Sequence, residues 1–189
     1  MTGADPGLDE ATRPTAGPYP VDDLLPEQQA VGQHLVQVHD HFRAELSQVR
    51  DVLGQVRGGV GQVGAARDAV QSMSLRANAW VLGGLCQRHC LVLTQHHELE
   101  SGTVFPHLGR ALPDLVPVLD RLHEEHLVVH AALEAVDRAL VELARDPAEL
   151  APVTAAVDEL SRVLLSHFAY EERELVGPLS RVGFFPGQA

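Results

Sequence analysis

Apolar residues recur at intervals of three and four along most of this 189-residue chain, and this spacing constrains the fold more than any other feature. Residues at these intervals share one face of a helix, whereas the alternation typical of β-strands does not occur in the sequence. The apolar stripes fall in four segments, at about residues 26–56, 66–100, 113–145 and 147–176. We therefore expect an all-α fold in which each segment buries one face.

Four long helices with short connections favour an antiparallel, up-down four-helix bundle. Glycine and proline mark the expected helix ends. Gly102 and Pro106 are expected to end the second helix, which leaves His107 outside it, and Gly177-Pro178 to end the fourth. The start of the chain is rich in proline and lacks an apolar pattern, so it is expected to be disordered. The predicted organisation is a disordered N-terminal arm (1–25), the bundle (26–180) and a C-terminal tail (181–189).

Charge and composition argue against several kinds of partner. The formal net charge is −12 and the chain has no lysine, whereas nucleic acids and anionic membranes are bound through basic patches. The sequence contains no run of about 18 apolar residues, the length that a membrane-spanning helix needs. The polar, acidic start does not resemble a secretory signal. Cys86 and Cys90 lie four apart on one helix face, a poor geometry for a disulfide, so a reducing cytoplasm is the expected compartment.

Histidines interrupt the apolar stripes. The chain has 11 histidines, and they are spread over separate helical segments rather than gathered in one tract. His39, His126 and His167 each take the place of a core residue, and each lies on a different helix. Three of the four predicted helices therefore direct a histidine into the core.

The second predicted helix carries two adjacent histidines. His96 lies four residues before Glu100, so these two side chains share one face of the helix. His97 points about 100° away from His96, because a helix turns once in about 3.6 residues. Only one of the two histidines is expected to be placed well for the site, and the spacing favours His96, with His97 as a neighbour.

Buried histidines and carboxylates that face one another indicate a metal site. Left unpaired, each group carries a desolvation penalty, and a shared cation satisfies them together. Imidazole and carboxylate donors without thiolate suit iron, manganese or zinc. The donors are too many for one tetrahedral ion, so two ions bridged by carboxylates fit better, with helix spacing favouring Glu171 over Glu172. The candidate ligands are His39, His96, Glu100, His126, His130, His167, Glu171 and Glu172.

The order and spacing of these candidate ligands resemble those of the hemerythrin-like (HHE cation-binding) family, and the resemblance covers about residues 27–180. The segments HHELESGTVFPHL and SHFAYEERELVGPL are similar to that family's ligand segments. The resemblance implies a non-heme di-iron centre, with histidines as terminal ligands and with carboxylates and an oxo group as bridges. The spacing in the invertebrate oxygen carriers would select Glu172 as a bridge, and that in many bacterial relatives Glu171. Some bacterial relatives lack the second histidine of the His126-xxx-His130 pair.

Three functions are compatible with such a centre. The resemblance favours binding or sensing of dioxygen or a related small oxidant. An enzyme acting on peroxide or nitric oxide would use the same centre and would need a proton donor, for which Tyr170 is a candidate. The third is a metal- or redox-responsive structural or regulatory bundle, including one that holds zinc. A ferritin-type centre is disfavoured because the chain has no Glu-x-x-His motif.

Overall fold

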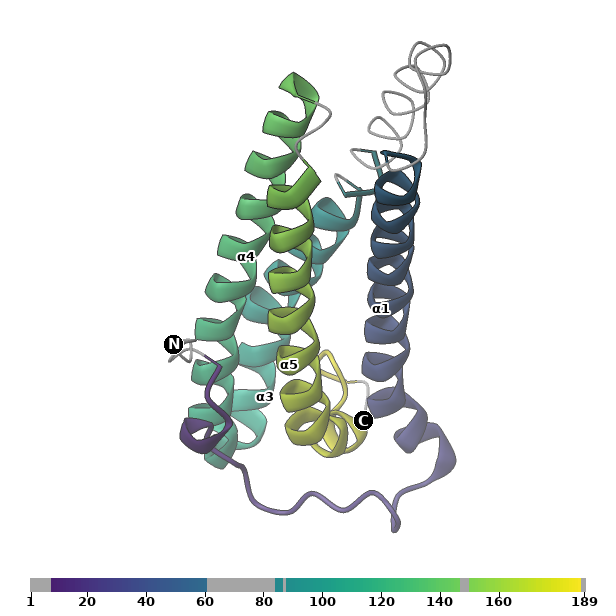
Figure 1. Cartoon of the computed structure of the whole chain (residues 1–189). Coiled ribbons are helices and arrows are strands. Elements are labelled where there is room, and N and C mark those ends of the chain that lie inside the picture. The colour runs from purple at the N-terminus through teal and green to yellow at the C-terminus, as the bar shows by residue number, and fades with distance from the viewer. Residues whose placement is uncertain (1–7, 61–83, 87, 147–149, 188–189) are drawn as a thin grey trace.

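The computed structural model describes residues 8–60, 84–86, 88–146 and 150–187, and these form helices and turns without a strand. The long helical segments lie side by side (Figure 1). They are α1 (Pro26–Val60), a second helix of residues 84–86 and 88–99, α4 (Val116–Arg145) and α5 (Leu150–Val182). The predicted all-α bundle is confirmed, while the expected start of the second helix near residue 66 lies outside the described residues. No described helix combines the length and apolar character that crossing a membrane requires.

The second helix does not end at Gly102 and Pro106, so that prediction is wrong. It continues through a π-helical turn, η2 (Glu100–Val104), into α3 (Phe105–Ala111), which places His107 inside a helix. The backbone N–H of Phe105 donates to the Glu100 carbonyl, five residues back. Pro106 follows in the first turn of α3, where its missing N–H is not needed. A short 3-10 turn, η3 (Pro113–Leu115), then leads into α4.

The predicted end of the fourth helix at Gly177-Pro178 is also wrong, because α5 continues to Val182 with Pro178 inside it. A proline inside a helix removes one backbone hydrogen bond. Here the turn that contains it is held by buried packing, since Leu175 and Leu179 are almost fully shielded from solvent. Tertiary contacts thus override the local preference to stop.

Helix α1 approaches α5 closely at Gly32. A Cβ atom at this position would collide with the Val176 carbonyl oxygen and with Ser180 Oγ, both on α5. The Val176 oxygen belongs to the backbone and cannot rotate away, so the two helices would have to separate. The absence of a side chain at Gly32 therefore sets the distance between α1 and α5 at this end of the bundle.

Replacing Gly32 by alanine is expected to lower the free energy of unfolding by about 1–3 kcal/mol, the usual effect of overpacking. Gly54→Ala is the matched control, because Gly54 also lies in α1 but has nothing within 4 Å of an added Cβ. The control should stabilise the protein by about 0.5–1 kcal/mol, since alanine favours a helix more than glycine does. Urea unfolding followed by circular dichroism measures both, and equal effects at the two positions would contradict the close approach.

The core consists of two apolar clusters stacked along the bundle. The upper cluster lies toward the end where α4 ends and α5 begins, and the lower cluster lies toward the opposite end. The upper cluster joins residues from all four long helical segments, among them Phe42, Leu93, Val129, Leu133, Leu164 and Phe168. The lower cluster includes Leu35, Val104, Leu108, Leu122, Tyr170, Leu175 and Leu179. The polar candidate ligands lie at the level where these two clusters meet.

The N-terminal arm was predicted to be disordered, but the structure places its described part, residues 8–25, against the bundle. Figure 1 shows it starting beside α4, with the 3-10 turn η1 (Glu10–Thr12), and crossing beneath the bundle to α1. Tyr19 fits against α5 where Gly177 has no side chain, and Arg181 donates to the Pro20 carbonyl. Leu8 of the arm belongs to the upper cluster, and Ala16 and Tyr19 pack against the lower one. Apolar and polar contacts together thus hold the arm to the bundle.

Candidate metal centre

Each bundle helix carries its candidate ligands between the two apolar clusters. On α4, for example, His126 lies between Leu122 of the lower cluster and Val129 of the upper cluster. The first and second helices follow the same order, and on α5 His167 and Glu171 lie between Leu164 of the upper cluster and Leu175 of the lower cluster. The ligands thus form one polar layer inside an apolar core. Water is largely excluded from such a layer, and its polar atoms need partners within the protein or a bound ion.

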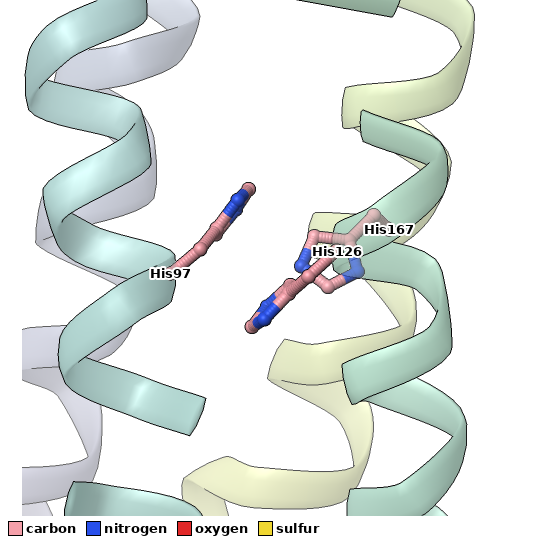
Figure 2. Close-up of side chains that lie close together, drawn as sticks. All are labelled: His97, His126 and His167. Carbon is pink, nitrogen blue, oxygen red and sulfur yellow. The ribbon is translucent and has the colours of Figure 1, made fainter. Parts of the chain in front are cut away.

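Two groups of side chains in this layer have the geometry to hold a cation. Within each group, one ligand atom from every residue lies within 4.8 Å of all the others. The first group is His39, His96, Glu100 and Glu171, and the second is His97, His126 and His167. Figure 2 shows the second group, with His97 facing His126 and His167 from the opposite side of the site.

Glu100 and Glu171 connect the two groups. One oxygen of Glu100 lies 3.2 Å from His96 Nε2 in the first group, and its other oxygen lies 3.6 Å from His126 Nε2 in the second. Glu171 Oε2 lies 3.4 Å from the Nε2 atoms of both His39 and His167. Each carboxylate therefore reaches both groups, which is the arrangement needed to bridge two ions.

Many of these ligand atoms are buried without a hydrogen-bond partner among the described residues. They are both ring nitrogens of His97, Nε2 of His126 and of His167, Oε2 of Glu100 and both oxygens of Glu171. Buried polar atoms rarely stay unpaired, because each pays a desolvation penalty. Lone pairs that converge on one small volume are what a cation requires, so these residues fit a metal centre.

Hydrogen bonds outside the two groups orient the histidine rings. Nδ1 of His167 lies 3.3 Å from a Glu125 oxygen, and Nδ1 of His126 lies 2.9 Å from the Ser101 hydroxyl. With a cation bound, both rings would be neutral with the proton on Nδ1, so that Nδ1–H donates outward and the Nε2 lone pair faces the site. Partners of this kind fix the tautomer of metal-binding histidines and raise their affinity.

Glu171 and Glu172, the two alternatives for a bridging carboxylate, have different environments. Glu171 is fully buried between the two groups. Glu172 lies outside them, where it accepts a 2.8 Å hydrogen bond from His39 Nδ1 and pairs with Arg43 at 2.8 Å. The geometry thus favours Glu171 as a ligand and gives Glu172 the task of orienting His39.

Both adjacent histidines of the second helix face the centre, so the expectation that only one could do so is wrong. His96 lies 3.3 Å from His39 on α1, whereas the His97 ring stacks on His126 of α4 with centroids 4.0 Å apart. The second helix contacts both neighbours, and two side chains about 100° apart can each reach one of them. The adjacent pair His96-His97 was the sequence signal for this arrangement.

His130, the second histidine of the predicted pair on α4, belongs to neither group. It is half-buried, and its ring centroid lies 5.9 Å from that of His97. The resemblance implied His130 as a terminal ligand, whereas in the structure His97 is the residue grouped with His126 and His167. Tyr170 also differs from its suggested role, because its hydroxyl donates to the Pro14 carbonyl of the N-terminal arm.

Burial and mutual contact determine the protonation of the layer. Burial, together with the charge of His167, lowers the pKa of His126 to about 2. Burial and repulsion from Glu171 hold the pKa of Glu100 well above its usual range. Burial would also raise the pKa of Glu171, but the positive charges of His167 and His39, each 3.4 Å from its Oε2, hold it well below its usual value. A neutral imidazole and an ionised carboxylate are the forms that bind a cation, so His126 and Glu171 are ready to bind, while Glu100 would release its proton as a cation binds.

The fold and this layer define a class of protein, the helical bundle with a buried histidine–carboxylate site for cations. Comparison with protein families agrees, since the model of the hemerythrin HHE cation-binding domain matches residues 30–179. The chain therefore belongs to the hemerythrin HHE cation-binding family. Searches of curated proteins and of solved structures gave no match.

Proposed function

We propose that this is a cytoplasmic non-heme di-iron protein, built on an antiparallel up-down bundle, that binds or senses dioxygen or a related small oxidant. One observation carries the proposal: Glu100 and Glu171 each contact histidines of both groups, as residues that bridge two ions would. Membership of a cation-binding family supports a metal as the ligand, and imidazole and carboxylate donors suit iron.

The two groups differ in composition, and this difference supports a binding function. The proposed ligands are His39 and His96 for one ion, His97, His126 and His167 for the other, and Glu100 and Glu171 between them. The first ion would have fewer histidine ligands, which leaves room there for a small ligand. Bound iron would supply the redox chemistry with oxygen, while the apolar clusters above and below keep bulk water out.

The identity of the metal is the part of the proposal that is simplest to test. Zinc and manganese accept the same donors, and zinc would favour a structural or regulatory role because it has no redox chemistry. We expect about two irons per chain in protein purified from iron-replete cells, measured by mass spectrometry of the metals. Two zinc ions under the same conditions would contradict the di-iron proposal.

Oxygen binding is expected to be reversible. The ferrous protein, prepared without oxygen, should change its visible absorption when oxygen is admitted and should recover it when oxygen is removed. Glu171→Gln is the control, because it removes one of the proposed bridges. A wild-type spectrum that ignores oxygen, or that changes once and never recovers, would contradict reversible binding.

Turnover of peroxide or nitric oxide is the weaker alternative. Turnover requires a proton donor at the centre, and Tyr170 is the candidate from the sequence. Its hydroxyl instead donates a hydrogen bond to the Pro14 carbonyl of the arm. Catalase and peroxidase assays on iron-loaded protein, with His126→Ala as the control, distinguish the two functions. Rates above those of free iron that are lost in His126→Ala would favour the enzyme.

A further inference from the structure

A buried ion pair connects the N-terminal arm to the metal centre. Arg13 of the arm has only 3 % of its side chain exposed, and its partner Glu125 on α4 has none. Arg13 Nε donates to one oxygen of Glu125 at 2.8 Å, and Arg13 Nη2 donates to the other at 2.9 Å. Such a two-pronged contact defines the orientation of the carboxylate plane as well as its position.

Glu125 in turn contacts His167, a proposed metal ligand, so its orientation affects that of the His167 ring. Its Oε2 atom, which accepts from Arg13 Nη2, also lies 3.3 Å from His167 Nδ1. Its Oε1 atom accepts a second hydrogen bond from Arg121 Nε at 3.1 Å. Loss of Arg13 would remove a donor from each oxygen of Glu125, so the Arg121 contact at Oε1 would leave the plane of the carboxylate less restrained.

The surroundings of Arg13 keep the guanidinium in this position. It stacks over the Tyr170 ring, with 4.7 Å from Cζ to the ring centroid, and its Nη1 atom pairs with Glu10 of the arm. The Tyr170 hydroxyl in turn donates to the carbonyl of Pro14, the next residue. Arg13 is thus held on both sides, by the arm and by α5, while it holds Glu125.

We propose that Arg13 is a positioning residue of the metal centre: by holding both oxygens of Glu125, it aligns His167 for metal binding and makes the N-terminal arm part of the site. The inference rests on the proposed function in so far as His167 binds a metal. It goes beyond that function because it assigns a role to a segment outside the bundle. Undocking of the arm would then loosen the ion held by His97, His126 and His167.

The test measures how fast the full-length protein, loaded with ferrous ion without oxygen, loses metal to a coloured ferrous chelator. Arg13→Gln is expected to release one of the two ions about tenfold faster, the lower end of the effect of removing an outer-sphere partner. Arg181→Gln is the matched control, because it removes another contact of the arm, to Pro20, without touching Glu125. It should keep the wild-type rate. Equal rates for wild type and Arg13→Gln would overturn the inference.

Two further variants separate positioning from plain docking of the arm. Arg13→Lys keeps the charge but has a single nitrogen, so it should resemble Arg13→Gln, and full recovery of the wild-type rate would overturn the inference. If Arg13 acts through Glu125, Arg13→Gln combined with Glu125→Gln should release metal at the rate of Glu125→Gln alone, within about twofold. Additive effects would indicate an independent structural role and would overturn it.

A metal-independent readout keeps this inference separate from the proposed function. Nitrogen NMR of the histidine rings in the metal-free protein reports the hydrogen bond at His167 Nδ1, and Arg13→Gln should weaken it while Arg181→Gln should not. If the wild type binds no ferrous ion, the proposed function fails, and this measurement still decides whether Arg13 positions His167. An unchanged His167 signal in folded Arg13→Gln, checked by circular dichroism, would overturn the inference.

Discussion

Glu171→Gln is expected to abolish binding of both metal ions. The Glu171 carboxylate is fully buried and lies 3.4 Å from a histidine of each group, so its charge and its lone pairs serve both proposed ions. Glutamine has nearly the same shape but no charge, and one end of its amide donates rather than accepts. Since loss of an outer-sphere partner alone lowers metal affinity about 10- to 100-fold, loss of a shared ligand should lower it by more than about 100-fold.

Metal content and thermal unfolding check this result together. At a free metal concentration of about 1,000 times Kd, a bound ion should stabilise the folded protein by about 4 kcal/mol. The wild type should therefore unfold at a higher temperature with metal than without it. Glu171→Gln should unfold at the same temperature in both conditions and should contain little metal after purification.

Glu172→Gln is the matched control, because the change is identical and the residue is adjacent. Glu172 accepts from His39 Nδ1 from outside the two groups, and the amide oxygen of glutamine can still accept that hydrogen bond. Two ions should remain bound, with the affinity of one lowered by at most about tenfold. If instead Glu172→Gln lost both ions and Glu171→Gln kept them, the carboxylate five residues after His167 would be the bridge.

The helices could be predicted from the sequence because apolar spacing reports directly on which face is buried. Their ends could not, because local stop signals compete with packing that the sequence does not display. Gly102 and Pro106 would end an isolated helix, yet a π-helical turn carries the chain past them into α3. Pro178 stays within α5 because the turn around it is buried.

The N-terminal arm shows a different limit of sequence reasoning. Its composition lacks an apolar stripe and therefore predicts disorder, but disorder also depends on what a segment meets. Arg13 finds a buried carboxylate 112 positions away in the sequence, in Glu125. Long-range pairs of this kind leave no periodic signal, so neither partner could be recognised as such from the sequence.

The candidate site was predictable in so far as it depends on helix faces. The positions of His39, His126 and His167 within apolar stripes predict inward-facing side chains, and all three are buried. The choice among neighbours was not predictable, because it depends on how each helix is rotated about its axis. A rotation of a few tens of degrees decides whether the second helix offers one histidine or both.

His97→Ala is expected to lose one of the two metal ions. Both ring nitrogens of His97 are buried without a hydrogen-bond partner in the described part of the chain, and the ring stacks on His126. Alanine removes one of three histidines from the second group, which leaves His126 and His167 with the carboxylates. We expect the variant to retain about one ion per chain, that of the first group, as measured by metal content after dialysis.

His130→Ala is the matched control for His97→Ala. His130 lies four residues after His126 on the same helix face, and its ring centroid lies 5.9 Å from that of His97. Because it belongs to neither group, its loss should leave two ions bound. The opposite outcome, one ion in His130→Ala and two in His97→Ala, would restore the His126-xxx-His130 pair as ligands. With the expected outcome, the adjacent pair His96-His97 serves both ions, because consecutive residues of one helix point toward different neighbouring helices.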